Sequence, residues 1–309
     1  MSHVTKVCGL SCVVLCLALD GCGMNEIAAN TAADIAHQSA PHMRGFWDYE
    51  IAGTGIAASI MQLEAMHSVS PSNERLSLLL ASSYIGYAVG WLEVEMERAE
   101  DAGRYDDAAR QKHRAELLYQ RARDLSVGVM RYRHAGIDAV LMTTEPTRLK
   151  RYLEEHYTDS EVDVAPLFWA ASAWGSQLNL TDDISNVVAL PTIRTLIEHS
   201  VRLNPGFEMA GGLQFLGGLY AQSPPEFGGN PEKGRLYFEE ALKVTGRKAH
   251  LVQLNYARFY ALTLSDKPLF LSLLREVVDS GDQGDAYRLA NKIARVRAEL
   301  LLAKANQLL

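Results

Sequence analysis

The residue with the clearest chemical role in this chain is Cys22, which closes a Leu-Asp-Gly-Cys sequence. All four cysteines lie within the first 22 residues, and an apolar run from Val7 to Leu19 precedes the last of them. That run has the length of a signal-peptide core and is too short for a permanent membrane span. The small Gly21 suits the cleavage site. We therefore expect residues 1–21 to be a cleaved lipoprotein signal peptide and Cys22 to carry lipid on its sulfur and amine.

Other interpretations of this segment stay open. Asp20 stands where a lipoprotein signal usually has an uncharged residue, so an ordinary cleaved signal or an uncleaved chain is an alternative. Cys8, Cys12 and Cys16 recur at every fourth residue, which would also suit a metal-binding or palmitoylated face. We interpret these three cysteines as small apolar residues of the discarded segment.

A mature chain that begins at Cys22 has no further cysteine. A disulfide framework, a thiol nucleophile and a cysteine-ligated zinc are therefore excluded downstream. Gly23 follows Cys22 where an aspartate would oppose export to the outer membrane, so we expect an envelope protein sorted to the outer membrane. Residues 22–43 are small and polar, and we expect them to form a lipidated tether with a weak first helix.

Side chains that could carry catalysis are scattered. His156 lies beside two glutamates, but the chain has no His-Glu-x-x-His pair of zinc ligands. None of the nine histidines accompanies a serine in a Gly-x-Ser-x-Gly sequence. Thr181 precedes Asp182 and Asp183, which we interpret as a helix N-cap with acids that favour the helix dipole. We expect no enzymatic activity, no metal and no cofactor.

Composition limits the class of protein. The 309 residues are 48 % hydrophobic and 22 % charged, which is typical of a globular chain of one large or two small domains. The net charge of −7, without a basic stripe, argues against a nucleic-acid partner. After the signal, no apolar run reaches the length of about 18 residues that a membrane span needs.

Helical periodicity runs through nearly the whole chain, and no segment alternates with a period of two. We therefore expect one all-α domain over residues 44–309. The expected helices are 51–67, 74–102, 106–126, 146–157, 164–178, 183–203, 207–222, 231–245, 248–263, 266–279 and 286–308. Gly128 is expected to kink or end the third of them.

Three helix pairs carry a spacing typical of tetratricopeptide repeats, in which small residues let two backbones approach and large residues fill the gap. The pairs are Leu80-Ala81…Tyr84 with Ala115…Tyr119…Ala122, Ala170-Ala171…Trp174 with Ile193…Ile197…Ser200, and Leu216-Gly217…Tyr220 with Gly234…Phe238…Ala241. We expect a helical bundle or solenoid of degenerate tetratricopeptide-like hairpins with inserted loops. Generic packing of a helical bundle is the alternative.

The loop before the helix at 231–245 is rich in proline and glycine. Its distinctive residues are Pro224, Pro225, Gly228, Gly229, Asn230 and Pro231. The first two prolines stop the preceding helix, and the glycines allow positive φ angles. Asn230 and Pro231 are typical of an N-cap and a first helical position. Glycine-rich loops before helices also bind phosphate, but no Lys-Ser/Thr pair or strand accompanies this one, so we interpret it as a structural connection.

Four aromatic residues are candidates for lining an apolar channel: Phe168, Trp169, Trp174 and Tyr220. On one helix, Trp169 and Trp174 point about 140° apart, so at most one of them can face a given groove. The alternative is that all four are core residues. A buried indole nitrogen needs a hydrogen-bond partner, which favours the edge of a site.

Several runs of the sequence resemble the T component (TatT) family of TRAP-transporter-associated lipoproteins. They are Leu167-Phe168-Trp169-Ala170-Ala171-Ser172-Ala173-Trp174-Gly175, Leu216-Gly217-Gly218-Leu219-Tyr220, the run from Pro224 to Gly234, Tyr237-Phe238-Glu239-Glu240-Ala241-Leu242 and Asn255-Tyr256-Ala257-Arg258-Phe259-Tyr260-Ala261. The resemblance spans nearly the whole mature chain and is strongest after residue 165. The chain departs from the family pattern at Gly234, where alanine is usual, and at Asp20.

The resemblance implies an all-helical periplasmic lipoprotein that forms a water-soluble homotrimer with a pore through each subunit. It also implies pairing with a TRAP-type periplasmic solute-binding protein, the P component, and guidance of a small hydrophobic ligand. It supplies no catalytic residues. A tetratricopeptide-like scaffold lipoprotein of the cell envelope, without a transport role, is the alternative function.

Overall fold

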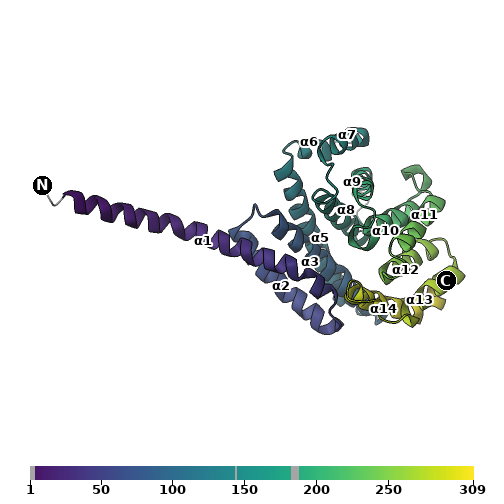
Figure 1. Cartoon of the computed structure of the whole chain (residues 1–309). Coiled ribbons are helices and arrows are strands. Elements are labelled where there is room, and N and C mark those ends of the chain that lie inside the picture. The colour runs from purple at the N-terminus through teal and green to yellow at the C-terminus, as the bar shows by residue number, and fades with distance from the viewer. Residues whose placement is uncertain (1–3, 143–144, 182–187) are drawn as a thin grey trace.

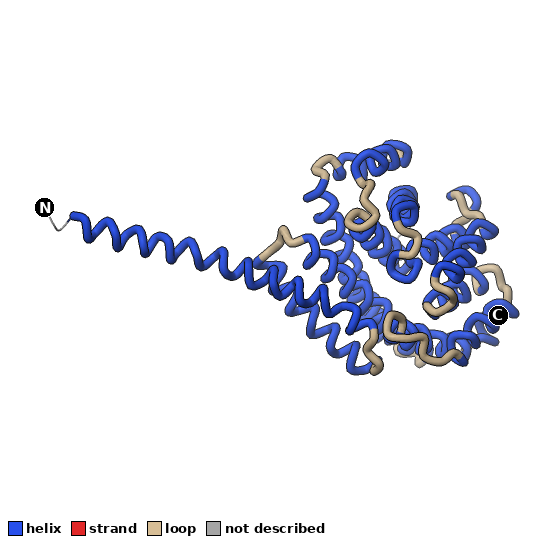
Figure 2. The backbone as a smooth tube through the Cα atoms, viewed as in Figure 1, coloured by secondary structure: helices blue, strands red, loops and turns tan. Residues whose placement is uncertain are grey.

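The structure is a computed structural model that describes residues 4–142, 145–181 and 188–309. All regular secondary structure in these ranges is helical, and they contain no strand (Figure 2). The all-α fold class is therefore confirmed. The expected cap at Asp182 and Asp183 and the side chains of the first 22 residues, including that of Cys22, lie outside the described part of the chain.

The helices follow one another along the chain with short connections. They are α1 (Val4–Arg44), α2 (Tyr49–Val69), α3 (Glu74–Tyr87), η1 (Ala88–Leu92), α4 (Glu93–Asp101), α5 (Tyr105–Arg133), α6 (Ile137–Leu141), α7 (Pro146–His156), α8 (Val164–Leu180), α9 (Leu190–Leu203), α10 (Phe207–Gln222), η3 (Pro225–Phe227), α11 (Pro231–Val244), α12 (His250–Tyr256), η4 (Ala257–Ala261), α13 (Lys267–Asp279), α14 (Arg288–Ala303) and α15 (Ala305–Leu308). Most expected helices therefore exist with nearly the expected bounds.

Helix α5 continues past Gly128, where a kink or an end was expected, and reaches Arg133. The buried side chains of Leu125, Val129 and Met130 flank Gly128 on this helix. A glycine inside a helix costs only about 1 kcal/mol, and burial of several large apolar side chains outweighs that cost. The short helix α6 was not expected from the sequence.

Helix α1 extends away from the body at its N-terminal end and packs on α2 and α3 at its C-terminal end (Figure 1). Ala33 is fully buried there. The Asn30 amide oxygen accepts hydrogen bonds of 2.7 Å from Ser70 Oγ and from Asn73 Nδ2. The segment expected as a tether with a weak helix is thus helical, and part of it belongs to the packed body.

Two helices contain π-helical turns that the sequence did not indicate. η1 joins α3 to α4, and η4 follows α12 without a break. A π turn releases backbone groups from the regular ladder, and such turns are frequent at functional sites. In η1, the carbonyl of Val89 accepts from Arg297 Nη1 at 3.1 Å and that of Gly90 accepts from Tyr49 Oη at 2.6 Å.

The three predicted helix pairs do pack together, as α3 with α5, α8 with α9, and α10 with α11. The glycines of the last pair sit at a very close approach. A Cβ added to Gly234 would lie 2.7 Å from the carbonyl oxygen of Gly217, and one added to Gly217 would lie 2.6 Å from the ring of Phe238. The description of these pairs as tetratricopeptide-like repeats stays a prediction.

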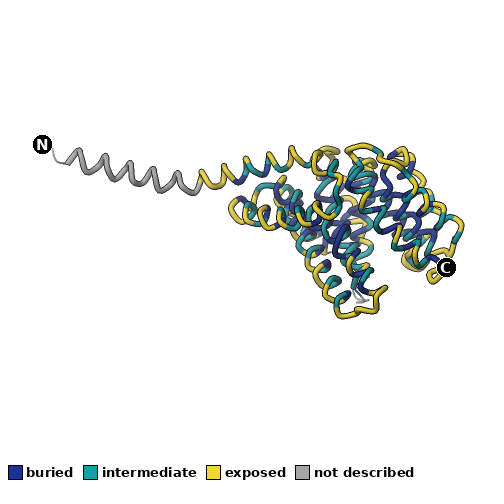
Figure 3. Tube along the Cα trace, turned by 90° about the horizontal axis from the view of Figure 1, so that it is seen from below, coloured by how far each residue is buried: buried dark blue, intermediate teal, exposed yellow. Residues whose placement is uncertain are grey.

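The chain closes on itself, because α14 returns to contact α1 and α2 (Figure 1). Leu289 on α14 is buried with Ala52 and Trp91 in one apolar cluster. Arg288 Nη1 donates to the carbonyl of Gly45 at 3.0 Å. Buried residues gather between the packed helices and exposed ones on their outer sides (Figure 3). Helices α1, α2 and α14 therefore lie around a common interior.

Candidate functional site

That interior is a cavity of about 1900 Å³. Small-molecule sites usually measure about 300–1,000 Å³, so this cavity has room for a ligand or for a passage. Most of its wall is apolar, and its wall residues come from helices far apart in the sequence. They include Ile56 of α2, Leu79 of α3, Phe168 of α8, Phe215 of α10, Phe259 of η4 and Ile293 of α14. The contact of α14 with α1 and α2 brings these distant wall residues together.

Two of the four predicted aromatic residues, Phe168 and Trp169, line the cavity. Their rings lie edge to face with centroids 4.8 Å apart, and Phe168 meets Phe207 in the same way at 5.3 Å. Phe207 and Phe215 also line the wall and were not singled out from the sequence. Gly175 was the available signal for Phe215, because a Cβ added there would lie 2.2 Å from the Phe215 ring.

Trp174 and Tyr220 are not among the described residues that line the cavity. The ring of Trp174 lies under the guanidinium of Arg123, 5.5 Å from ring centroid to Cζ. The Tyr220 hydroxyl donates to Glu198 at 2.8 Å and accepts from Lys233 Nζ at 2.6 Å. Burial and the Glu198 carboxylate raise the pKa of Tyr220 to about 12. Both residues belong to helix packing, and the angular separation on α8 accounts for the difference between the two tryptophans.

The proline- and glycine-rich connection has the expected local structure. Asn230 caps α11 by accepting from the Lys233 N–H at 3.0 Å, and Pro231 is its first residue. Gly228 has a φ of 80°. A Cβ on Gly229 would lie 1.7 Å from the carbonyl oxygen of Ser223, so only glycine fits there. The neighbouring Pro224 lines the cavity edge, and Pro225 begins the short η3.

The first turn of α10 is left-handed. Glu208, Met209 and Ala210 have φ angles of 46°, 58° and 59°. Each such residue costs roughly 1–2 kcal/mol when it is not glycine. Two hydrogen bonds stabilise the turn. Gln214 Nε2 donates to the Met209 carbonyl at 2.8 Å, and Asn255 Nδ2 donates to Gln214 Oε1 at 2.8 Å. Backbone strain of this kind gathers at ligand sites and switches, and this turn lines the cavity.

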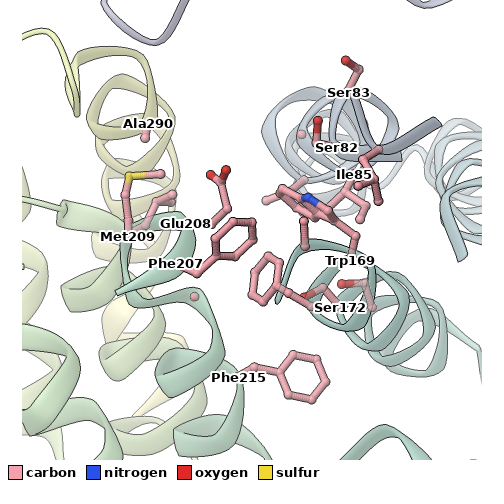
Figure 4. A pocket seen from close by; sticks show the side chains of 18 of the residues that line it. Ser82, Ser83, Ile85, Trp169, Ser172, Phe207, Glu208, Met209, Phe215 and Ala290 are labelled. Atoms are coloured by element: carbon pink, nitrogen blue, oxygen red, sulfur yellow. The ribbon is translucent and has the colours of Figure 1, made fainter. Parts of the chain in front are cut away.

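The left-handed turn points the Glu208 carboxylate into the space between α10 and the α3 and α8 helices (Figure 4). Its side chain is only 20 % exposed. Burial raises the pKa of Glu208 above its ordinary value of 4.5, and Arg44 opposes that shift. Arg44 Nη2 lies 2.9 Å from Glu208 Oε1 and its side chain is 54 % exposed. Sequence reasoning missed both residues.

A second group of charges lies deeper in the wall. Arg297 Nη2 binds Glu97 Oε1 at 2.7 Å and Glu93 Oε2 at 3.0 Å, while Arg258 Nη2 binds Glu97 at 2.8 Å. The Tyr119 hydroxyl donates to Glu93. Two guanidinium groups thus face two carboxylates, and the group is neutral. It joins α4, α5, η4 and α14 around the cavity.

The protein is built of packed helices around a large, partly open chamber. In the described ranges, no group of histidine, cysteine and acidic residues is fit to hold a metal. Residues 47–309 match the family model described as TRAP transporter T-component. The chain therefore belongs to the TRAP transporter T-component family. An uncharacterized protein of Treponema pallidum (strain Nichols) is 22 % identical over 276 residues, which cover 82 % of each chain.

Family membership makes this chain a TRAP-transporter-associated component. It also suggests a transport role without catalysis, and association with the cell envelope. In the part of the chain that the structure describes, no helix combines the length and the apolar character that crossing a bilayer requires.

Proposed function

We propose that this protein is a lipid-anchored periplasmic T component that docks a TRAP-type solute-binding protein and guides a small hydrophobic ligand through its cavity. The single observation that carries the proposal is the apolar chamber of about 1900 Å³ in a chain of this family. The alternative of a scaffold without a ligand does not account for so large an interior.

The wall chemistry suits passage of an apolar molecule without a covalent step. Transfer of apolar surface from water into such a wall stabilises by about 25 cal/mol per Å². The edge-to-face rings of Phe168, Trp169 and Phe207 offer a large apolar contact in defined rotamers. The deeper arginines, Arg258 and Arg297, already have carboxylate partners, so an apolar ligand would leave neither of them newly unpaired.

The anchor is the second part of the proposal. Acylation of Cys22 would hold the body at the membrane through the helix that leads into it, and Gly23 would direct the protein to the outer membrane. Two or three acyl chains, at about 0.8 kcal/mol per buried CH2, give a durable anchor. The homotrimer implied by the family resemblance is proposed together with this arrangement.

Affinity purification from a detergent extract of the native envelope tests the docking. The tagged, acylated protein should recover a solute-binding protein of a TRAP transporter. A mock purification from the untagged strain controls for binding to the resin. Extracts that repeatedly yield envelope-assembly factors and never a solute-binding protein would refute the proposal and support the scaffold function.

A further inference from the structure

Glu208 differs from the deeper acids of the cavity wall. Glu93 and Glu97 are paired with the buried Arg297, whose side chain is 5 % exposed. Glu208 is itself mostly buried, yet its arginine partner lies largely in solvent at the end of another helix. A mostly buried carboxylate with an exposed partner can exchange that partner for another cation at small cost, because the free guanidinium returns to water.

The groups beside Glu208 suit an organic cation. Phe207 precedes it in the chain, and the rings of Phe207 and Trp169 lie 6.3 Å apart, centroid to centroid, near the carboxylate (Figure 4). Phe168 completes the cluster. Aromatic faces attract ammonium groups, and quaternary ammonium ligands are recognised by such rings together with an acid. The carboxylate and the rings thus present one cation-attracting end in an otherwise apolar chamber.

The carboxylate is held in place by its backbone. The left-handed turn over Glu208, Met209 and Ala210 is strained, and the buried Gln214 and Asn255 brace it. A regular right-handed turn would aim the side chain elsewhere. A strained turn that neighbouring side chains hold in place keeps its side chain in one orientation. The Glu208 carboxylate is therefore preorganised for binding.

We infer that the cavity takes an amphipathic cation, with an alkylammonium group that replaces Arg44 at Glu208 and an apolar portion that lies along Phe168, Trp169 and Phe207. This inference rests on the proposed ligand-carrying function and names the class of ligand. An anionic headgroup fits less well, because it would have to draw Arg44 away and leave the buried Glu208 carboxylate without a partner.

Three water-soluble probes of equal chain length test the inference: octyltrimethylammonium, octanesulfonate and octanol. Each is titrated calorimetrically into the full-length protein in lipid nanodiscs, with empty nanodiscs as the reference. The cation should bind about tenfold more tightly than the other two probes. Glu208→Gln should remove that preference by lowering the affinity for the cation to about that for octanol.

Two further variants separate the charge from effects on folding. Arg44→Gln removes the competing cation and should tighten binding of octyltrimethylammonium several-fold, a gain that misfolding cannot produce. Glu240→Gln removes a surface carboxylate that pairs with Lys243 and should change nothing.

The outcomes distinguish this inference from the proposed function. Equal binding of all three probes, unaffected by Glu208→Gln, would overturn the cation inference and leave the carriage of apolar ligands intact. A preference for octanesulfonate that Arg44→Gln abolishes would also overturn it. Binding of none of the probes would count against both the inference and the ligand-carrying function.

Discussion

Arg44, the last residue of α1, forms a 2.9 Å ion pair with Glu208 in the left-handed first turn of α10. The two residues are 164 positions apart in the chain. The helix that would lead from the anchor is therefore joined directly to the strained part of the cavity wall. Any ligand that competes for Glu208 also acts on the attachment of α1.

Stability should depend on pH through Glu208. Burial raises the pKa of this carboxyl in the folded protein, so the folded state binds its proton more tightly than the unfolded state. The stabilisation from the proton is fully present below the ordinary value of 4.5 and is lost as the pH rises through the folded pKa. Glu208→Gln stays neutral, so its free energy of unfolding relative to wild type should increase as the pH rises above 4.5.

Denaturant unfolding at a series of pH values measures this difference. Glu240→Gln, on an exposed face of α11, is the matched control and should follow the wild-type curve. Parallel curves for Glu208→Gln and wild type across the range would contradict the assignment of a buried, raised-pKa carboxyl.

Glycine-to-alanine changes should have opposite effects on stability at the close contact of α10 and α11 and at an open position of α2. Gly234→Ala would place a methyl group 2.7 Å from the Gly217 carbonyl oxygen and should destabilise by about 1–3 kcal/mol. Gly55→Ala, in α2 with nothing within 4 Å of the new methyl, should stabilise by about 0.5–1 kcal/mol. Thermal unfolding compares the two variants. A neutral Gly234→Ala would mean that α11 shifts easily and that the glycine is not required.

The sequence predicted the parts of the fold that depend on local chemistry. Asn230 caps α11 as expected, and the small residues at 217 and 234 mark the helix pair that they join. Hydrophobic periodicity predicts which residues are buried, but it does not predict the sign of the backbone φ angle. The left-handed turn at Glu208 therefore looked like an ordinary helix, because no glycine occupies its three positions.

The site was predicted only in part for a different reason. Phe168 and Trp169 were identified from their residue types, but Trp174 and Tyr220 were indistinguishable from them by that criterion. Helix geometry lets only one of Trp169 and Trp174 face the chamber, and the packing of α8 against α5 and α10 decides which one does. A single sequence does not encode such contacts in a local pattern. The pairing of Arg44 with Glu208 was hidden for the same reason.

The neutral group of charges in the wall should be essential to the fold. Arg297→Met would leave Glu93 and Glu97 with one fewer buried cation, and loss of one partner of a buried ion pair typically costs about 3–5 kcal/mol. Arg235→Met removes a partly exposed arginine that pairs with Glu232 and Glu239, and it should cost less than about 1 kcal/mol. Urea unfolding of the two variants should show this contrast, and equal midpoints would refute it.

The proposed anchor predicts the location of the protein. Cys22→Ser should prevent acylation, so a soluble or uncleaved form should appear in place of the membrane-bound one. Gly23→Asp should move the acylated protein from the outer to the inner membrane. Fractionation of both variants beside wild type measures these changes. Unaltered membrane retention of Cys22→Ser would contradict the anchor, and an unmoved Gly23→Asp would contradict the sorting signal.

The central claim is that the chamber carries a small molecule, and native mass spectrometry of the acylated protein purified from its host tests this most directly. Ser82 lines the cavity, so Ser82→Trp should block it, whereas the exposed Ser68→Trp should not. We predict a trimer in which wild type and Ser68→Trp retain an added small-molecule mass that Ser82→Trp lacks. A wild-type mass equal to that of the acylated chain alone, with no added molecule, would contradict the account.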